Sequence, residues 1–448
     1  MFTPSKTALV ATLALSLSAC DSFLDKDPTG NLPSAGIFDD VTGAEAAIAG
    51  GYNRVQGPMD DFVIFGDLAA DYAVHTGSFP SWTEVDVHNL QTTNAEAGGQ
   101  WEGWYELVNQ ANLIIDNVDG AQNISAARAG EIKGEAYAMR AYAYHALVRW
   151  FGGVPLILSG DVDLENLNVP RASADEVYSQ IFSDLDAAEP LVAASRPVGL
   201  IDRDVVRAMR ARVLLYDGQY DAAGAIAAEL YDKYPLVTPG GVYDALNSSE
   251  SIWELQYTTD DQNSMSFFAF VTGGRREYGP SGQAQAAFDS TDGRSDFNIA
   301  LDGTTPIIAK YFRVNTDDDH HFLFRGAEMA LIEAEVAARN GNAAAAIALV
   351  NEIRTRAGAP LYGEDDGDGG VRGDADGNGS ISGDEAFDLV IAERGLELAY
   401  EGHRWHDLVR IGEAVERLDD LTDPNFTLWP IPQSEIQRNT AAVQNTGY

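Results

Sequence analysis

Residues 327–356 read AEMALIEAEVAARNGNAAAAIALVNEIRTR, and this stretch decides the class of fold. Apolar and small residues recur every three or four positions on both sides of Asn340-Gly341, which predicts two helices joined by a tight turn. Residues 205–231, VVRAMRARVLLYDGQYDAAGAIAAELY, repeat the pattern around Asp217-Gly218. Each hairpin is close in length to the ~34-residue tetratricopeptide unit, and stacked units of this kind form a curved scaffold. Two unrelated amphipathic hairpins would give the same pattern, so the repeat is a hypothesis.

Helical periodicity extends outward from these hairpins over residues 44–55, 101–118, 132–151 and 175–191. Ser173 is the expected N-cap of the last of these helices. Residues 236–326 differ, because they are rich in aromatic residues, Gly, Ser and Thr and lack a helical period, and only 252–257 alternate like a short strand. The predicted fold is therefore all-α, with tetratricopeptide-like helical hairpins forming a superhelical scaffold, long irregular loops and a few short strands.

The charge of the chain limits its partners. The 448 residues include 69 acidic and 29 basic side chains, for a formal net charge of −40. Nucleic acid is excluded as a partner because phosphate binding needs a basic surface, and a neutral ligand is favoured over an anionic one. A saline habitat and a GC-rich genome would both produce this composition.

The N-terminus predicts a lipoprotein. Lys6 and the apolar stretch 8–17 have the form of a signal peptide, and Leu17-Ser18-Ala19-Cys20 resembles a bacterial lipobox. Cys20 is the only cysteine, so we expect it to be acylated, with palmitate among the chains, after removal of residues 1–19. A chance cysteine behind an ordinary signal peptide is the alternative. Residues 20–40 are the expected tether and 41–448 the folded domain, attached to the membrane through lipid only.

Four further motifs occur in a fixed order along the chain. They are Trp104-Tyr105 with Ala111-Asn112; Gly134-Glu135-Ala136 and Arg140-Ala141-Tyr142 leading to FGGVP at 151–155; ERGLELAYEGHRWHDLVR at 393–410; and LWPIP at 428–432 with Glu435-Ile436 and Asn439. Together they resemble the SusD/RagB family of outer-membrane nutrient-binding lipoproteins over nearly the whole mature chain.

The resemblance implies a function as well as a fold. Members of the family hold glycans in irregular loops on a helical scaffold and work with a TonB-dependent porin of the SusC type. The resemblance therefore implies a lipid-anchored outer-membrane protein of the cell surface that binds an oligosaccharide or polysaccharide and delivers it to such a porin. The shared motifs are structural and carry no catalytic role, so no enzyme activity is expected. A secreted carbohydrate-active enzyme and a calcium-dependent protein-docking scaffold are the alternatives.

Residues 374–385, DADGNGSISGDE, match the twelve-residue EF-hand calcium loop, within an insertion at about 361–385. A helix is predicted to follow the loop, but none precedes it, as in half EF-hands. A merely solvated acidic loop is the alternative. The expected Ca²⁺ ligands are Asp374, Asp376, Asn378, Ser380, Ser382 and the bidentate Glu385.

Sugar rings stack on aromatic side chains that lie outside helical patterns, which favours Trp82, its neighbour Phe79 and Tyr278 as ligand contacts. The other tryptophans occupy periodic or motif positions and are expected in the core.

Glu393, Glu397 and Glu401 lie on one helical face and do not flank a sugar as glycosidase carboxylates do, so salt bridges to Arg394 and Arg404 are expected. The histidines at 320, 321, 403 and 406 lack a third ligand at zinc spacing.

Overall fold

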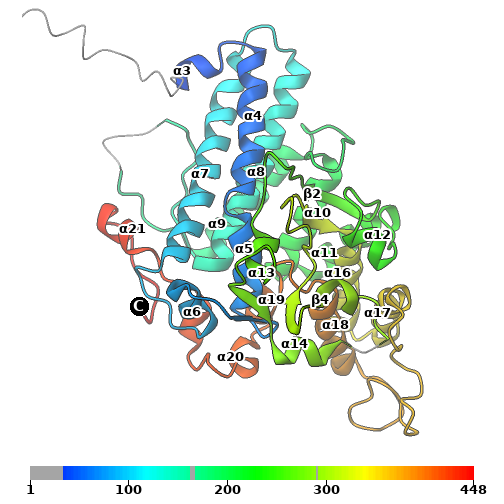
Figure 1. Cartoon of the computed structure of the whole chain (residues 1–448). Helices are drawn as coiled ribbons and strands as arrows, with labels where there is room; N and C mark the ends of the chain where they lie inside the picture. The colour runs from blue at the N-terminus through cyan, green and yellow to red at the C-terminus, as the bar shows by residue number, and fades with distance from the viewer. Residues whose placement is uncertain (1–33, 162–166, 289–290) are drawn as a thin grey trace, which may run out of the picture.

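The computed structural model describes residues 34–161, 167–288 and 291–448, and helices dominate this part of the chain (Figure 1). The predicted helical class with a few short strands is confirmed. The longer helices are α4 (Val41–Gln56), α5 (Met59–Leu68), α7 (Ala95–Asn117), α8 (Ala126–Phe151), α9 (Ala174–Ala188), α10 (Arg203–Tyr216), α11 (Tyr220–Lys233), α16 (Gly326–Arg339), α17 (Ala343–Ala357) and α18 (Gly383–Glu397). The shorter ones are α3 (Ser34–Ile37), α6 (Pro80–Asp86), α12 (Pro239–Tyr243), α13 (Met265–Ala269), α14 (Gly282–Ala287), α15 (Ser295–Asn298), α19 (Arg404–Arg410), α20 (Ala414–Arg417) and α21 (Gln433–Arg438).

Both predicted hairpins are present, as α10–α11 and α16–α17. Gly218 and Gly341 occupy their turns with positive φ angles, a conformation that costs glycine nothing sterically. Helix α11 packs against α16, and a Cβ atom on Gly224 would lie only 3.1 Å from Val336. Helix α18 packs against α16 and α17, so the hairpins form a stacked helical array.

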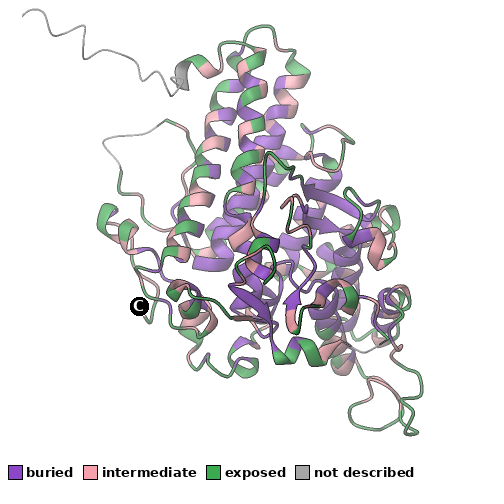
Figure 2. Ribbon diagram, viewed as in Figure 1, coloured by how far each residue is buried: buried purple, intermediate pink, exposed green. Residues whose placement is uncertain are grey.

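Helix α8 is the centre of the molecule. It packs against α4, α7 and α9, and its residues from Ala138 to Phe151 are buried. Figure 2 shows these buried positions continuing into the other helices of the array, while the outward faces of α4 and α7 are exposed or half-buried. Arg140 of α8 forms an ion pair with Asp184 of α9, at 2.6 Å. The helix ends at Gly152, whose φ is +70°, as the glycines at this position predict.

In the described residues, the irregular stretch contributes strands to three two-stranded antiparallel sheets. β2 (Ser251–Leu255) pairs with β6 (His321–Arg325), β4 (Ile299–Asp302) with β5 (Thr305–Ile308), and β1 (Ala73–His75) with β3 (Tyr278–Pro280). The predicted strand at 252–257 is therefore confirmed as β2. The β1–β3 pair joins an early loop to one that lies about 200 residues later, and this pairing positions the predicted aromatic ligand contacts.

The folded domain begins slightly earlier than the sequence predicts. Helix α3 lies inside the predicted tether, and Ile37 and Phe38 pack against the core. The backbone N–H of Val41 donates to the carbonyl of Gln122 at 2.9 Å, which attaches this segment to the loop that precedes α8. Cys20 and the predicted signal peptide lie outside the described residues. None of the helices in the described part combines the length and the apolar composition needed to cross a bilayer.

Candidate functional site

The three predicted aromatic contacts converge in space, although they come from distant parts of the chain. The Trp82 ring lies 5.7 Å from that of Phe79 and 6.2 Å from that of Tyr278, measured between centroids. Phe65 and Phe268 complete the cluster, each at 5.2 Å from Trp82. The β1–β3 pairing and α6 bring these residues together.

Burial overturns the predicted role of two of these residues. Trp82 is 3% exposed and Tyr278 is 1% exposed, so neither ring can stack on a sugar. Trp82 lies in α6, a seven-residue helix with Pro80 at its first position, so the prediction that it lies outside any helix is wrong. A helix of two turns is too short to give a clear period in the sequence.

Of the three predicted contacts, Phe79 is the one that is only half-buried. Its ring is covered by the guanidinium of Arg275, 3.9 Å from the ring centroid, and that side chain is 44% exposed. The buried carboxylate of Glu277 accepts hydrogen bonds from the backbone N–H groups of Ser78 and Phe79, at 2.7 and 3.2 Å, and pairs with Arg275. These contacts of Glu277 fix the backbone of Ser78 and Phe79. Phe79 and Arg275 form a small surface patch beside them.

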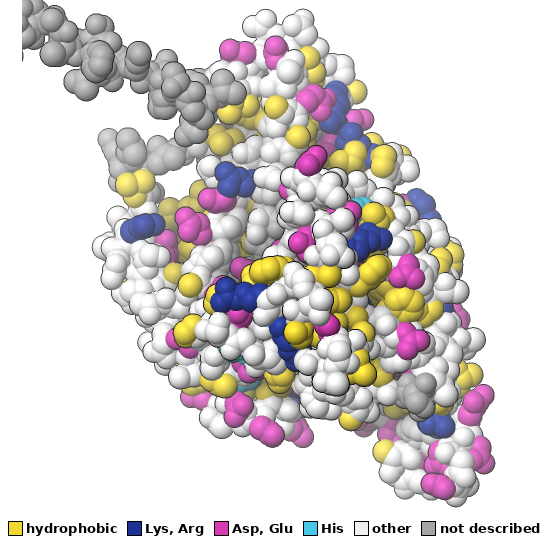
Figure 3. Space-filling model, viewed as in Figure 1, with side chains coloured by type: hydrophobic (Ala, Val, Ile, Leu, Met, Phe, Trp, Pro, Cys, Tyr) yellow, Lys and Arg dark blue, Asp and Glu magenta, His cyan; other side chains and the backbone are white. Residues whose placement is uncertain are grey.

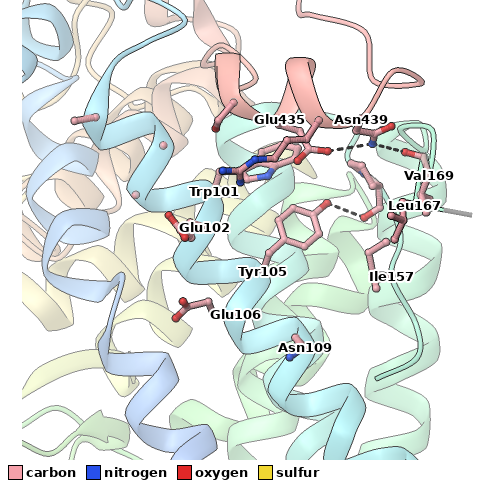
Figure 4. A pocket seen from close by; sticks show the side chains of 16 residues that line it. Trp101, Glu102, Tyr105, Glu106, Asn109, Ile157, Leu167, Val169, Glu435 and Asn439 are labelled. Atoms are coloured by element: carbon pink, nitrogen blue, oxygen red, sulfur yellow. Dashed lines mark hydrogen bonds between the residues drawn. The ribbon is translucent and has the colours of Figure 1, made fainter. Parts of the chain in front are cut away.

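A larger concave site lies between α7, α21 and the segment that follows α8 (Figure 4). Its volume is about 670 Å³, within the range of ligand pockets. Tyr105 forms the accessible aromatic wall, and Trp101, which is 7% exposed, packs beside it with ring centroids 5.0 Å apart. Tyr105 is half-buried, and its hydroxyl donates to the carbonyl of Pro155 at 2.7 Å, which holds the ring in place.

Polar groups surround this aromatic wall. Asn439 donates to the carbonyl of Val169 at 2.7 Å and to the carboxylate of Glu435 at 3.0 Å, so the end of α21 is joined to the opposite wall. The remaining polar lining residues are Glu102, Glu106, Asn109, Ser434 and Arg438. An aromatic face with carboxylates and amides beside it can stack on a sugar ring and bind its hydroxyl groups.

The three carboxylates at four-residue spacing are buried in ion pairs. Glu393 contacts Arg294 and Arg354, and Glu401 contacts Lys310 and Arg325. Glu397 contacts Arg294, Arg325 and Arg356. The expected salt bridges therefore exist, but the predicted partners were wrong: Arg394 pairs with Asp407 and Arg404 with Asp71. Buried and paired, these glutamates do not face a substrate.

The histidines are also core residues. His320 contacts Glu254 at 3.0 Å, and His321, His403 and His406 are buried. Burial holds the pKa values of His403 and His406 well below the usual range, so both imidazoles are neutral. In the described part of the chain, no histidine belongs to a group of three or more side chains that could hold a metal.

The predicted calcium loop projects from the body between α17 and α18, and acidic side chains gather on that projection (Figure 3). Carboxylate oxygens of Asp374, Asp376 and Glu385 lie within 4.8 Å of one another. Backbone N–H groups at 377, 378 and 379 donate to Asp374, which curls the loop around its carboxylate. Hydrogen bonds from Ser382, and from the backbone of residues 375 and 376, lower the pKa of Glu385 to about 2.

The carboxylates among the six predicted calcium ligands, those of Asp374, Asp376 and Glu385, thus lie together. Asn378 accepts hydrogen bonds from Ser380, and the Ser382 hydroxyl accepts from the backbone N–H of Glu385 as the N-cap of α18. Three carboxylates in one loop form the charge set that Ca²⁺ binds, so the residues fit the ion.

The pocket beside Tyr105 was missed because its aromatic residues follow a helical period. Trp101 and Tyr105 occupy the predicted inward face of their helix, and only the partners of that face, α21 and the segment after α8, reveal the cavity. One sequence signal was available: Gly98-Gly99 directly precedes the predicted helical stretch 101–118, and glycine leaves the backbone uncovered by a side chain.

Comparison with known proteins identifies the family. A family model described as "Starch-binding associating with outer membrane" matches residues 22–215, and the SusD family model matches residues 308–425. SusD-like protein P38 of Formosa agariphila is 27% identical, over 96% of each chain. SusD-like protein P2 of the same organism is also 27% identical, over 97% of this chain and 98% of that protein.

Solved structures share the fold. A laminarin-binding SusD-like protein superposes with a TM-score of 0.79 at 22% identity, covering 92% of this chain and all of that chain. A SusD superfamily protein from Bacteroides vulgatus also gives 0.79, at 19% identity and with the same coverage. The two family models together match more than half of the chain and include the motifs at 134–155 and 393–410. The chain belongs to the SusD/RagB family.

Proposed function

We propose that this protein binds a glycan at the outer-membrane surface, in the pocket between α7 and α21. The observation that carries the proposal is the half-buried ring of Tyr105, with Trp101 packed beside it and carboxylate and amide groups around it, in a member of this family. The family model described as starch-binding and the laminarin-binding structural relative support a carbohydrate as ligand. The burial of Glu393, Glu397 and Glu401 in ion pairs supports binding without hydrolysis.

Replacement of Tyr105 tests the site. Tyr105→Ala should weaken binding of a neutral polysaccharide by about 1 to 3 kcal/mol, the range for a lost central aromatic contact. Tyr105→Phe should bind nearly as well, because it keeps the ring and loses only the hydrogen bond to Pro155. Calorimetric titration against a panel that includes laminarin measures both, and thermal melting of each variant checks that it is folded. Phe79→Ala is the matched control.

The result decides between the two surfaces. Loss of binding in Phe79→Ala with full binding in Tyr105→Ala would move the glycan to the Phe79–Arg275 patch. Release of sugar products at catalytic turnover would contradict the binding-protein proposal.

We further propose that the protein is a lipoprotein anchored through Cys20 that delivers its ligand to a TonB-dependent porin of the SusC type. The lipobox-like sequence before Cys20 and the family membership support this. Membrane fractionation of a Cys20→Ser precursor tests the anchor, since the mutant protein should be released in folded form. Co-purification with the porin tests the partner.

We also propose that the loop 374–385 binds Ca²⁺ through Asp374, Asp376 and Glu385. The convergence of their carboxylates supports the site, and the ion would neutralise charges that otherwise repel one another. Because Glu385 also lies in the first turn of α18, binding would stabilise the start of that helix. Calorimetric titration with CaCl₂ tests the proposal directly.

A further inference from the structure

The pocket beside Tyr105 is one of two hollows that meet on α7. The second has a volume of about 330 Å³ and lies between the end of α4, the start of α5 and α7. Both hollows are lined by Gly99, Glu102 and Glu106. In the close view, Glu102 and Glu106 project from α7 on the side away from Tyr105 (Figure 4). A ligand in the first hollow can therefore reach the second by crossing α7 at this turn.

Where the two hollows meet on α7, Gly98 and Gly99 leave the helix backbone without side chains. A Cβ atom on Gly98 or Gly99 would meet no atom within 4 Å, so packing does not require glycine at either position. Gly103, one turn later, is different, because a Cβ there would lie 2.9 Å from the Cβ of Pro58. Glycine inside a helix costs about 0.5 to 1 kcal/mol relative to alanine. The pair at 98 and 99 thus weakens α7 without a compensating contact in the described structure.

The charge around the two hollows selects the ligand. Their carboxylates are those of Asp61, Glu102, Glu106 and Glu435, against the guanidinium groups of Arg54 and Arg438. Arg54 is already paired with Glu106. The whole chain, these groups included, carries a formal net charge of −40. A polyanion such as a uronate or sulfated glycan would be repelled, whereas carboxylates accept hydrogen bonds from uncharged hydroxyl groups.

We infer that the two hollows form one groove, which binds an extended, uncharged glycan chain passing over Gly98 and Gly99. The inference rests on the proposed function and adds the class of substrate to it. Sugar units on either side of α7 contact the two hollows, and the unit between them lies against the bare helix backbone. The ligand is thus a polysaccharide segment longer than one pocket can hold.

A length series and two variants of Gly99 test the groove. The probes are neutral oligosaccharides of increasing length from laminarin, with malto- and cello-oligosaccharides as parallel series, and alginate as the polyanion. The wild type should bind the longest neutral chains at least tenfold more tightly than trisaccharides and should not bind alginate. Because Gly99 lies where the two hollows meet, Gly99→Trp should reduce affinity for the longest chains at least tenfold more than it reduces affinity for trisaccharides. Gly99→Ala, its matched control, should raise the melting temperature, as alanine favours the helix.

The outcomes separate this inference from the proposed function. If no neutral glycan binds the wild type, the proposed function and the inference both fail. If neutral glycans bind but affinity does not depend on chain length, or if Gly99→Trp keeps the full advantage of long chains while remaining folded, the inference alone is overturned. Equal binding of alginate would overturn the assignment to uncharged chains.

Discussion

Trp82 packs edge-on against Phe65, Phe268 and Tyr278, with centroid separations of 5.2 to 6.2 Å. Trp82→Ala should therefore lower the free energy of unfolding by about 3 to 5 kcal/mol, the usual cost of emptying a large buried aromatic site. Phe79→Ala, the half-buried neighbour, should cost less. Urea denaturation of both variants measures the difference. An unchanged unfolding midpoint for Trp82→Ala would return Trp82 to the surface and revive its role as a sugar contact.

Individual residues were the hardest feature to predict, because their surroundings come from distant segments. The side chain of Trp82 is covered by Phe268 of α13 and by Tyr278 of β3, both about 200 residues later in the chain. Likewise, Arg404 has glutamates nearby in sequence but pairs with Asp71, which lies more than 300 residues earlier. Sequence spacing identified which residues were aromatic or charged, and it could not identify the partners that bury them.

At the scale of elements, the start of α18 offers a way to separate capping from calcium binding. Ser382 caps the helix and forms a reciprocal capping box with Glu385, whereas Glu385 also belongs to the carboxylate cluster. Ser382→Ala should lower stability by about 1 kcal/mol, with or without calcium. Glu385→Gln should abolish the response to calcium, which for the wild type is about 2.7 kcal/mol at a hundredfold excess over Kd. Differential scanning calorimetry in EDTA and in CaCl₂ measures both.

The controls for this pair are the wild type in EDTA and the same protein after calcium is restored. If EDTA leaves the wild-type melting curve unmoved, the loop is only a solvated acidic insertion. A calcium response that survives in Glu385→Gln would move the ligands elsewhere.

The ends of helices could be predicted well where a glycine or an N-capping residue nearby in the sequence determines them. Glycines with positive φ angles end the first helices of both hairpins, and Ser173 caps α9 through the capping box with Glu176. The calcium loop is followed by a helix and not preceded by one, as its composition predicts. Helices such as α3, α6 and α13 were not predicted from the sequence, because each has seven residues or fewer. Tertiary packing, not hydrophobic periodicity, specifies helices of this length.

At the scale of the whole molecule, the ion pairs around α18 connect the irregular stretch to the helical array. Arg294 and Arg325 come from that stretch, Arg356 comes from α17, and all three contact Glu397. Glu397, Arg294 and Arg325 are buried, and the Arg356 side chain is only 7% exposed, so the network is stable only when every charge is paired. This network explains why the motif at 393–410 is structural: its carboxylates hold distant segments on the scaffold.

The same network sets the acid limit of stability. Burial alone would raise the pKa of Glu397, but the guanidinium groups of Arg356, Arg325 and Arg294 lower it, and Arg394 and Arg410 similarly lower the pKa of Asp407 to about 2. Both folded-state values lie below those of the unfolded chain, about 4. The stabilisation is therefore complete above pH 5 and is lost as the pH falls from about 4 toward 2, where the unfolded state binds more protons.

Replacement of Glu397 tests this account. Glu397→Gln removes the carboxylate that pairs with Arg294, Arg325 and Arg356, of which the first two are buried, so it should cost about 3 to 5 kcal/mol at pH 7. It should also lose less further stability between pH 5 and pH 3 than the wild type, because one of the groups that must be protonated is gone. Urea denaturation across this pH range measures both effects, with the exposed Glu416→Gln as matched control. A wild type that keeps its full stability at pH 3, or a Glu397→Gln variant as stable as Glu416→Gln at pH 7, would show that the network does not hold the segments together.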